Sequence, residues 1–237
     1  MPHPAAAQPH HRRWQGWVWC SQSSRTVAQQ QVLVATTMED TSMTDDQDPS
    51  PILLWARETA ARWLDVPDFR DRRWLHVQAV GAKAELLAPA FAEDGPLLAA
   101  SAWLHDIGYA PQLQETGFHP IDGARELDRK GVEPRLSRLV ANHSGACVEA
   151  RLRGLVSEMA VYPDDASAVR DALWTCDMTT SPVGEPVDFE DRLSEIKARY
   201  GVEHTVPRAI DEAGSEIRAA IRRTRHRAVE HGINVDF

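Results

Sequence analysis

Apolar residues recur at intervals of three and four positions along most of the chain after residue 49, a period typical of amphipathic helices. Proline and glycine residues divide this pattern into separate segments. Alternating β-branched runs, which would indicate strands, are almost absent apart from Val32-Leu33-Val34. We therefore expect an all-α fold. The pattern predicts helices over residues 51–64, 69–90, 96–106, 120–130, 134–142, 146–153, 166–178, 189–200 and 207–231.

Residues 1–48 show no sustained hydrophobic period and are rich in Pro, Gln, Ser, Thr and His. Such a composition is typical of a disordered extension, so we expect no fixed structure there. Met43 begins Met43-Thr44-Asp45-Asp46, which resembles a natural N-terminus, and the true start is therefore either Met1 or Met43. Residues 49–237 are expected to form one helical domain, with its core motifs within 70–180 and C-terminal helices within 185–232.

Composition limits the classes of function. The chain has 237 residues, of which 43% are hydrophobic, enough for one sizeable core. A net charge of −9 argues against specific nucleic-acid binding, and no run approaches the roughly 18 apolar residues that predict a membrane span. Cys20, Cys147 and Cys176 are odd in number and show no paired spacing, which is typical of reduced thiols in the cytoplasm. The sequence does not indicate an oligomeric state.

A His-Asp pair follows the most apolar predicted helix. The run from Leu97 to Leu104 leads directly into His105-Asp106, and we expect Gly108 to end this helix. At a helix end, two adjacent side chains can both reach one polar point. An imidazole and a carboxylate are suitable ligands for Zn, Mn or Fe, so the pair is a candidate metal site.

Four more potential ligands lie on or beside apolar segments in the middle of the chain. Any one of them could be a hydrogen-bonded core residue, but burying several such polar groups is costly unless they are paired or bind an ion. A shared polar centre explains the whole set better. With the His-Asp pair, the predicted metal ligands are His76, His105, Asp106, His119, His143 and Asp177.

The order of these residues resembles that of the HD-domain superfamily. His76, the His105-Asp106 pair within His-Asp-Ile-Gly, and Asp177 are similar to its H…HD…D pattern. The sequence His-Asp-Ile-Gly is similar to that of the HDIG subgroup, and the segments 119–124 (HPIDGA) and 141–145 (ANHSG) resemble those of HD proteins that hold two metals. The full order is similar to bacterial dinucleoside tetraphosphate hydrolases and also to the di-iron oxygenases of the superfamily. The resemblance implies a helical bundle with the metal centre in its core.

The resemblance also implies a reaction. One divalent ion would be held by His76, His105, Asp106 and Asp177, and Asp106 would bridge to a second ion held by the other two histidines. The ions would be Fe, Mn, Zn, Co or Mg, and they would activate a hydroxide. The expected activity is therefore hydrolysis of a phosphoester or phosphoanhydride in a small nucleotide or phosphorylated metabolite. Tyr109 stands where cyclic-dinucleotide phosphodiesterases usually carry Lys, which disfavours that branch.

A phosphorylated substrate also needs cationic contacts. Arg73 and Lys83 share a helix face with His76, so we expect them to contact the phosphate. The predicted catalytic residues are therefore Asp106, Arg73 and Lys83. Arg192 and Arg199 share another face, where we favour surface ion pairs over a role in the site. Two alternative functions use the same scaffold: a di-iron oxygenase with the same six ligands, and a non-catalytic nucleotide-binding module. Specificity is expected to depend on residues 109–118 and on the C-terminal helices.

Overall fold

The computed structural model describes residues 49–235, which belong to a single unit. These residues are helical and contain no β-strand, only one isolated bridge between Thr180 and Pro186. The all-α prediction is therefore confirmed. The expectation of a disordered extension and the question of the start at Met1 or Met43 both concern residues outside the described part of the chain.

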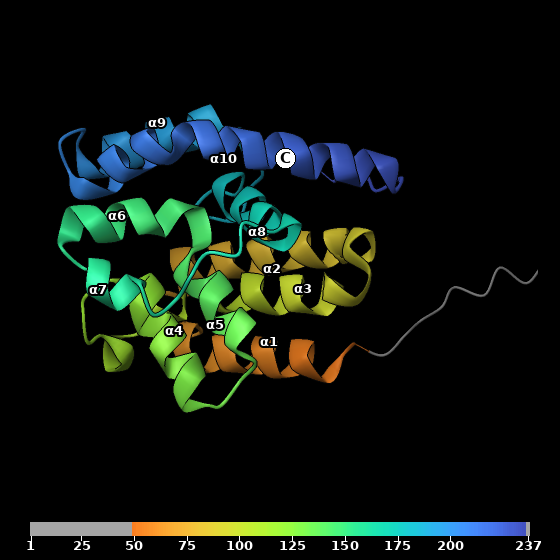
Figure 1. Ribbon diagram of the computed structural model, residues 1–237, viewed down its shortest axis with the longest axis horizontal. Coiled ribbons are helices and arrows are strands. Elements are labelled where there is room, and N and C mark those ends of the chain that lie inside the picture. Colours follow the sequence, from red (N-terminus) through yellow and green to blue (C-terminus); the bar gives the residue numbers. More distant parts are fainter. Residues whose placement is uncertain (1–48, 236–237) are drawn as a thin grey trace, which may run out of the picture. The chain divides into compact units, whose positions relative to one another are not determined.

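Most predicted helices appear close to their expected positions (Figure 1). Three of them, 51–64, 146–153 and 189–200, have the predicted bounds. The helices are α1 (Pro51–Leu64), α2 (Leu75–Leu87), α3 (Gly95–Leu104), α4 (His119–Arg129), α5 (Pro134–Ala141), α6 (Ala146–Arg153), α7 (Val156–Met159), α8 (Ala168–Met178), α9 (Phe189–Tyr200) and α10 (Thr205–Glu230). Short 3-10 or π-helical segments lie at Arg70–Trp74, Ala88–Asp94, Ile107–Tyr109, Pro111–Leu113 and His143–Gly145.

The single helix predicted over 69–90 is divided in the structure. A π-helical turn, Arg70–Trp74, precedes α2, and a 3-10 segment, Ala88–Asp94, follows it. Pro89 has no backbone N–H for a helical hydrogen bond, and Ala92 adopts a φ of 47°, so the α-helical path cannot continue. The four-residue α7 was not predicted, because one turn of helix is too short to show a hydrophobic period.

The expectation for Gly108 was wrong. Helix α3 ends at Leu104, before the glycine, and Gly108 lies inside a 3-10 turn that spans Ile107–Tyr109. A Cβ atom at this position would lie 2.0 Å from the carbonyl oxygen of His119. The glycine therefore permits the close approach of the turn to α4, and it does not end the preceding helix.

Two helices carry most of the core. In α3, nine of ten residues are buried, and in α8 all residues after Ala168 are buried. Helices α1 and α2 pack on α3, while α10 packs on α6 and α8 (Figure 1). Because α3 and α8 lie inside the domain, polar side chains at their ends come to lie inside it as well. The fold thus positions a buried polar centre where these helices end.

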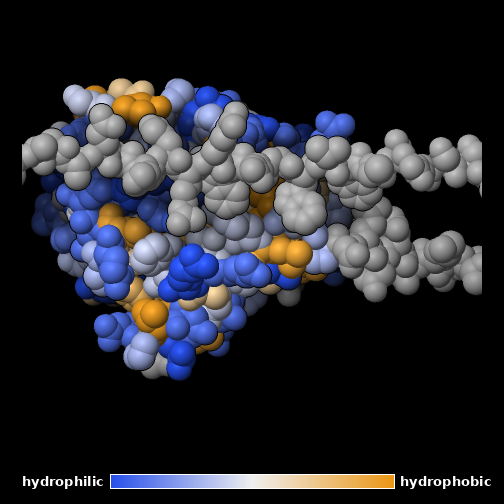
Figure 2. All heavy atoms as spheres, turned by 90° about the horizontal axis from the view of Figure 1, so that it is seen from below, coloured by the Kyte–Doolittle hydropathy of each residue, from blue (hydrophilic) through white to orange (hydrophobic). Residues whose placement is uncertain are grey.

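The surface shows no single large apolar face on the side seen in Figure 2, where hydrophobic residues are scattered among hydrophilic ones outside the grey atoms. Large exposed hydrophobic side chains such as Leu86 and Val161 are separated in the fold, which is ordinary for a protein surface. Within residues 49–235, no helix combines the length and the apolar character needed to cross a membrane.

Candidate metal centre

The six predicted ligands come from five separate parts of the fold and meet at one point. Most of them lie at helix ends, where a side chain can turn into the core. His105 is fully buried, and His119 is the most exposed of the set, with 17% of its side chain accessible. The ligands are His76 on α2, His105 and Asp106 just after α3, His119 at the start of α4, His143 just after α5, and Asp177 near the end of α8.

The turn after α3 directs both members of the His-Asp pair inward. His105 keeps a helical backbone, whereas Asp106 has φ −105° and ψ 5° and leaves the helix. This change of direction brings the Asp106 Oδ2 atom to 3.3 Å from His105 Nε2. The two adjacent side chains therefore face the same centre, as the sequence predicted for a helix end.

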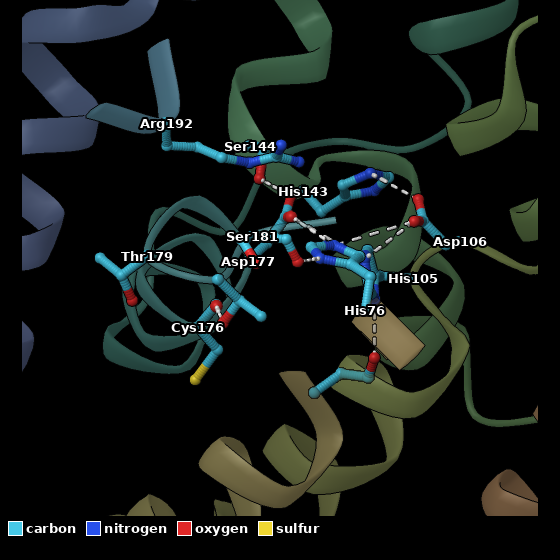
Figure 3. Close-up of polar contacts among 12 residues, drawn as sticks. His76, His105, Asp106, His143, Ser144, Cys176, Asp177, Thr179, Ser181 and Arg192 are labelled. Atoms are coloured by element: carbon cyan, nitrogen blue, oxygen red, sulfur yellow. Dashed lines mark hydrogen bonds and ion pairs between the residues drawn. The ribbon is translucent and has the colours of Figure 1, made fainter. Parts of the chain in front are cut away.

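The ligands form two groups of three. In each group the potential ligand atoms lie within 4.8 Å of one another. In the first, His76 Nε2 lies 3.0 Å from Asp177 Oδ1 (Figure 3). In the second, the Nε2 atoms of His119 and His143 lie 3.1 Å apart. The first group is His76, His105 and Asp177, and the second is Asp106, His119 and His143.

Asp106 lies between the two groups and turns one oxygen toward each. Its Oδ2 atom is 3.3 Å from His105 Nε2 and 4.0 Å from His76 Nε2. Its Oδ1 atom is 3.3 Å from His119 Nε2 and 3.9 Å from His143 Nε2. A carboxylate in this position can bind one ion through each oxygen.

Backbone carbonyls hold three of the imidazoles with Nε2 toward the centre. The Nδ1 atoms lie 3.1 Å from the Ser181 oxygen for His76, 2.7 Å from that of Ala102 for His105, and 2.6 Å from that of Val140 for His143. A carbonyl only accepts hydrogen bonds, so each Nδ1 must carry the proton that it donates. This leaves Nε2 as the ligating atom, an arrangement that commonly orients metal-binding histidines.

The chemistry of this donor set fits divalent metal ions. His105 Nε2 is buried and has no hydrogen-bond partner, although a carboxylate oxygen lies 3.3 Å away. Likewise, the Nε2 atoms of His119 and His143 lie 3.1 Å apart. If both present lone pairs, these repel each other unless a cation binds them. Imidazole and carboxylate ligands suit Zn, Mn, Fe and Co. The residues therefore fit a metal centre.

Neighbouring charges keep both carboxylates ionised in spite of their burial. Burial alone would raise the pKa of Asp106, but the Arg73 guanidinium and His105 outweigh it and hold this pKa well below the usual range. For Asp177, burial is similarly outweighed by the close contact with His76 and by the nearby His105, so its pKa is also lowered. Both carboxylates are therefore negatively charged, which is the form that binds a cation.

The histidines divide into neutral and charged forms in the metal-free chain. Burial lowers the pKa of His76, and burial together with His119 and His105 lowers that of His143 to about 4. Burial also acts against the charged form of His105, but the Asp106 carboxylate prevails and raises its pKa to about 9. A proton on His105 therefore neutralises part of the buried negative charge until an ion replaces it.

Three further residues support the ligands. The Ser144 hydroxyl donates a hydrogen bond to Asp177 Oδ2, and the Arg73 guanidinium donates one to Asp106 Oδ2. Arg73 also lies over the Tyr109 ring, with its Cζ atom 3.8 Å from the ring centroid. The Tyr109 ring in turn stacks on the imidazole of His119 at a centroid distance of 3.9 Å. These contacts fix the orientation of ligands in both groups.

A cavity of about 300 Å³ opens onto the centre. Asp106, His119, His143 and Asp177 lie in its wall, so a small molecule in the cavity can contact these candidate metal ligands. The same wall is rich in cationic side chains, which favours an anionic ligand. These are the guanidinium groups of Arg73, Arg153, Arg192 and Arg199.

Among the three residues predicted to act in catalysis, the structure brings Asp106 and Arg73 to the centre but not Lys83. The Lys83 ammonium donates to the Thr179 carbonyl oxygen at 2.8 Å and to the Thr179 hydroxyl at 2.9 Å. It does not line the cavity and lies two helical turns from His76, against the end of α8. A shared helix face was therefore not enough to place Lys83 at the centre, because α8 packs against its end of α2 and Thr179 binds the ammonium.

Sequence reasoning placed Arg192 and Arg199 on the surface, and this is incomplete. Both pair with Glu195, as expected for an ion-pairing face, but both also line the cavity, and Arg192 is only 7% exposed. Arg153 and the hydrogen bond of Ser144 were missed. No local signal in the sequence indicates that arginines of α6 and α9 reach the cavity. Ser144, in contrast, lies within the segment 141–145, which already resembled HD proteins.

The comparison with protein families agrees with this geometry. The model of the HD domain matches residues 73–179, a range that includes all six candidate ligands. No curated protein and no solved structure matches the chain. From the match and the buried His/Asp groups within this range, we conclude that residues 73–179 form an HD domain.

Proposed function

We propose that this chain is a metal-dependent phosphohydrolase that cleaves a phosphoester or phosphoanhydride bond in a small phosphorylated substrate. HD domains are generally found in metal-dependent hydrolases. The observation that carries the proposal is the juxtaposition of two groups of metal-binding atoms with a cavity lined by arginines. The metal-binding atoms suit divalent ions, and the guanidinium groups suit the phosphate that such ions activate.

In this proposal His76, His105 and Asp177 hold one ion, His119 and His143 hold a second, and Asp106 bridges the two. The observed positions of its two carboxylate oxygens support the bridge. Divalent ions bound there supply a hydroxide nucleophile near neutral pH and neutralise charge on the phosphoryl oxygens.

Two residues beside the ligands act on the substrate itself. Arg73 holds Asp106 ionised and lines the cavity, so its remaining N–H groups can bind phosphoryl oxygens. Burial raises the pKa of Tyr109 above its ordinary value, and the phenol therefore stays protonated near neutral pH. It can donate a hydrogen bond to a substrate oxygen. The charged wall is the feature that favours hydrolysis of an anionic phosphate over the oxygenase alternative.

The test uses the full chain, stripped of metal and reloaded with Mn²⁺ or Co²⁺. Phosphate or p-nitrophenol release is measured from p-nitrophenyl phosphate and adenosine diphosphate, under argon and in air. We expect turnover that depends on metal and not on oxygen. Asp106→Asn should reduce both metal content and activity, the activity by at least about 100-fold, more than the loss typical of a change outside the ligand shell.

Asp211→Asn is the matched control. Asp211 is exposed on α10 and pairs with Lys197, so its substitution should leave metal content and turnover unchanged. Turnover that occurs only with iron and oxygen would replace the hydrolase by the oxygenase alternative. If the metal-loaded protein binds adenosine diphosphate and hydrolyses neither compound, the chain is a binding module.

A further inference from the structure

Helix α9 lies outside the matched HD domain, yet it contributes to the wall of the metal-site cavity. Arg192 and Arg199 are seven residues apart on this helix, on one face, and both line the cavity. Figure 3 shows the Arg192 side chain extending from its helix toward Ser144 and His143. A part of the chain beyond the HD domain therefore presents positive charge to the candidate metal centre.

The hydrogen bonding of Arg192 is incomplete. Arg192 is 7% exposed, and its Nη1 atom donates to Glu195 Oε2 at 2.5 Å. Its Nε atom is buried without a hydrogen-bond partner. A buried guanidinium with an unused donor is unfavourable, so such a group is expected where a ligand completes the hydrogen bonding.

One carboxylate serves two arginines on this face. Glu195 Oε2 accepts from Arg192, and Glu195 Oε1 lies 3.4 Å from Arg199 Nε. A single negative charge cannot neutralise both guanidinium groups, and an excess of positive charge remains beside the cavity. This excess is suited to an anion, and the planar guanidinium matches two oxygens of a phosphate.

A second cavity of about 250 Å³ adjoins this face and shares four lining residues with the first. The shared residues are Arg73, Tyr109, Arg192 and Arg199. The α9 arginines thus lie where the two cavities adjoin. There is room beside them for a ligand that extends beyond the first cavity.

We propose that Arg192 and Arg199 form a second anion subsite, which binds another phosphate of a substrate whose scissile phosphate lies at the metal centre. The proposal rests on the phosphohydrolase function and narrows its substrates to compounds with two or more phosphate groups. A monophosphate would occupy the metal centre and leave the α9 arginines without their anion. Arg73, which lies between α9 and Asp106, would contact the scissile phosphate.

Binding without metal tests the subsite directly. Inorganic pyrophosphate is titrated into the metal-free full chain by calorimetry, because a metal ion would itself bind pyrophosphate. We expect Arg192→Gln and Arg199→Gln each to weaken binding by about 10-fold or more, the effect of losing a charged hydrogen bond. Arg208→Gln, at an exposed position of α10 that does not line either cavity, should bind as the wild type does.

Thermal unfolding of each variant shows whether it is folded. Arg199 is 30% exposed, so Arg199→Gln keeps the test valid if the more buried Arg192→Gln does not fold. Malonate serves as a dicarboxylate probe of similar length. Malonate binding that equals or exceeds pyrophosphate binding would overturn the assignment to phosphate.

Kinetics of the metal-loaded protein provide the second measurement. Both arginine variants should raise the KM for adenosine diphosphate by about 10-fold or more, and that for p-nitrophenyl phosphate by much less. If the variants bind pyrophosphate as tightly as the wild type, the subsite proposal fails even where hydrolysis is observed. If arginine-dependent binding is found but neither compound is hydrolysed, the subsite remains and the phosphohydrolase proposal fails.

Discussion

Gly108 packs directly against the backbone of His119. A Cβ atom added at Gly108 would lie 2.0 Å from the His119 carbonyl oxygen and 2.6 Å from the Gly123 nitrogen. Gly108 follows the His105-Asp106 pair by two residues, and His119 begins α4. This backbone contact therefore sets the distance between ligands of the first group and ligands of the second.

Gly108→Ala should destabilise the fold and separate the two groups of ligands. Neither neighbouring backbone can move as a flexible side chain could, so we expect a loss in unfolding free energy of at least the about 1–3 kcal/mol typical of overpacking. Urea denaturation followed by circular dichroism measures it. At the control position, Gly214, the nearest atom is the mobile end of Arg218, and Gly214→Ala should be neutral or stabilising. If Gly108→Ala is as stable as the wild type, the close contact between Gly108 and His119 is not needed for the fold.

Ser144→Ala should weaken metal binding without unfolding the chain. The hydroxyl donates to Asp177 Oδ2 and orients this carboxylate for the first group. Loss of such an orienting hydrogen bond typically reduces metal affinity by about 10–100-fold. Competition with a chromogenic chelator measures the affinity. Ser137→Ala removes another buried hydroxyl, one without a hydrogen-bond partner, and should leave the affinity unchanged. Equal affinities for both variants would exclude the orienting role.

The stability of the metal-free chain should fall as the pH rises toward 9. The pKa of His105 is raised to about 9, above its ordinary value of 6.5, because the Asp106 carboxylate outweighs burial. Its charged form stabilises the fold fully below pH 6.5, and this contribution is lost as the pH passes through about 9. Thermal unfolding between pH 6.5 and 9 measures the loss.

Asp106→Asn provides the comparison for this pH dependence. Without the carboxylate, burial lowers the pKa of His105, so the decline in stability above pH 6.5 should disappear. Histidine NMR spectra of the metal-free wild type should show one imidazole titrating near pH 9. If every histidine of the wild type is neutral at pH 7.5, the assignment of a charged His105 is wrong.

Lys83→Met should reduce stability but not metal content. Lys83 is 8% exposed, and its ammonium donates hydrogen bonds to the carbonyl and hydroxyl oxygens of Thr179, so its removal leaves a buried carbonyl without this donor. We expect a loss of about 1–3 kcal/mol in unfolding free energy. Metal analysis of the folded variant should give the wild-type value. A stable variant with impaired phosphate release would restore Lys83 to the catalytic set.

Local sequence was sufficient to predict the helices that begin and end at strong signals. Helix α1 begins at Pro51, and α9 ends before Gly201, which adopts a φ of 83°. Both signals act through the backbone of the residue itself, so neighbours in space hardly change them. In contrast, the π-helical turn at Arg70–Trp74 has no signal in the pattern, since its residues could equally continue an α-helix.

The sequence by itself determined the all-α class, because helical periodicity is local, and its resemblance to HD domains predicted six potential ligands and their division between two ions. Tertiary structure alone decided how these side chains are brought together and held. The two oxygens of Asp106 face different groups only because α3, α4 and α8 converge, and carbonyl groups from the fold turn the imidazoles inward. Packing likewise directed Lys83 toward Thr179 and Arg192 toward the cavity. The direction of a long side chain depends on what its helix packs against, which residue spacing along the chain does not encode.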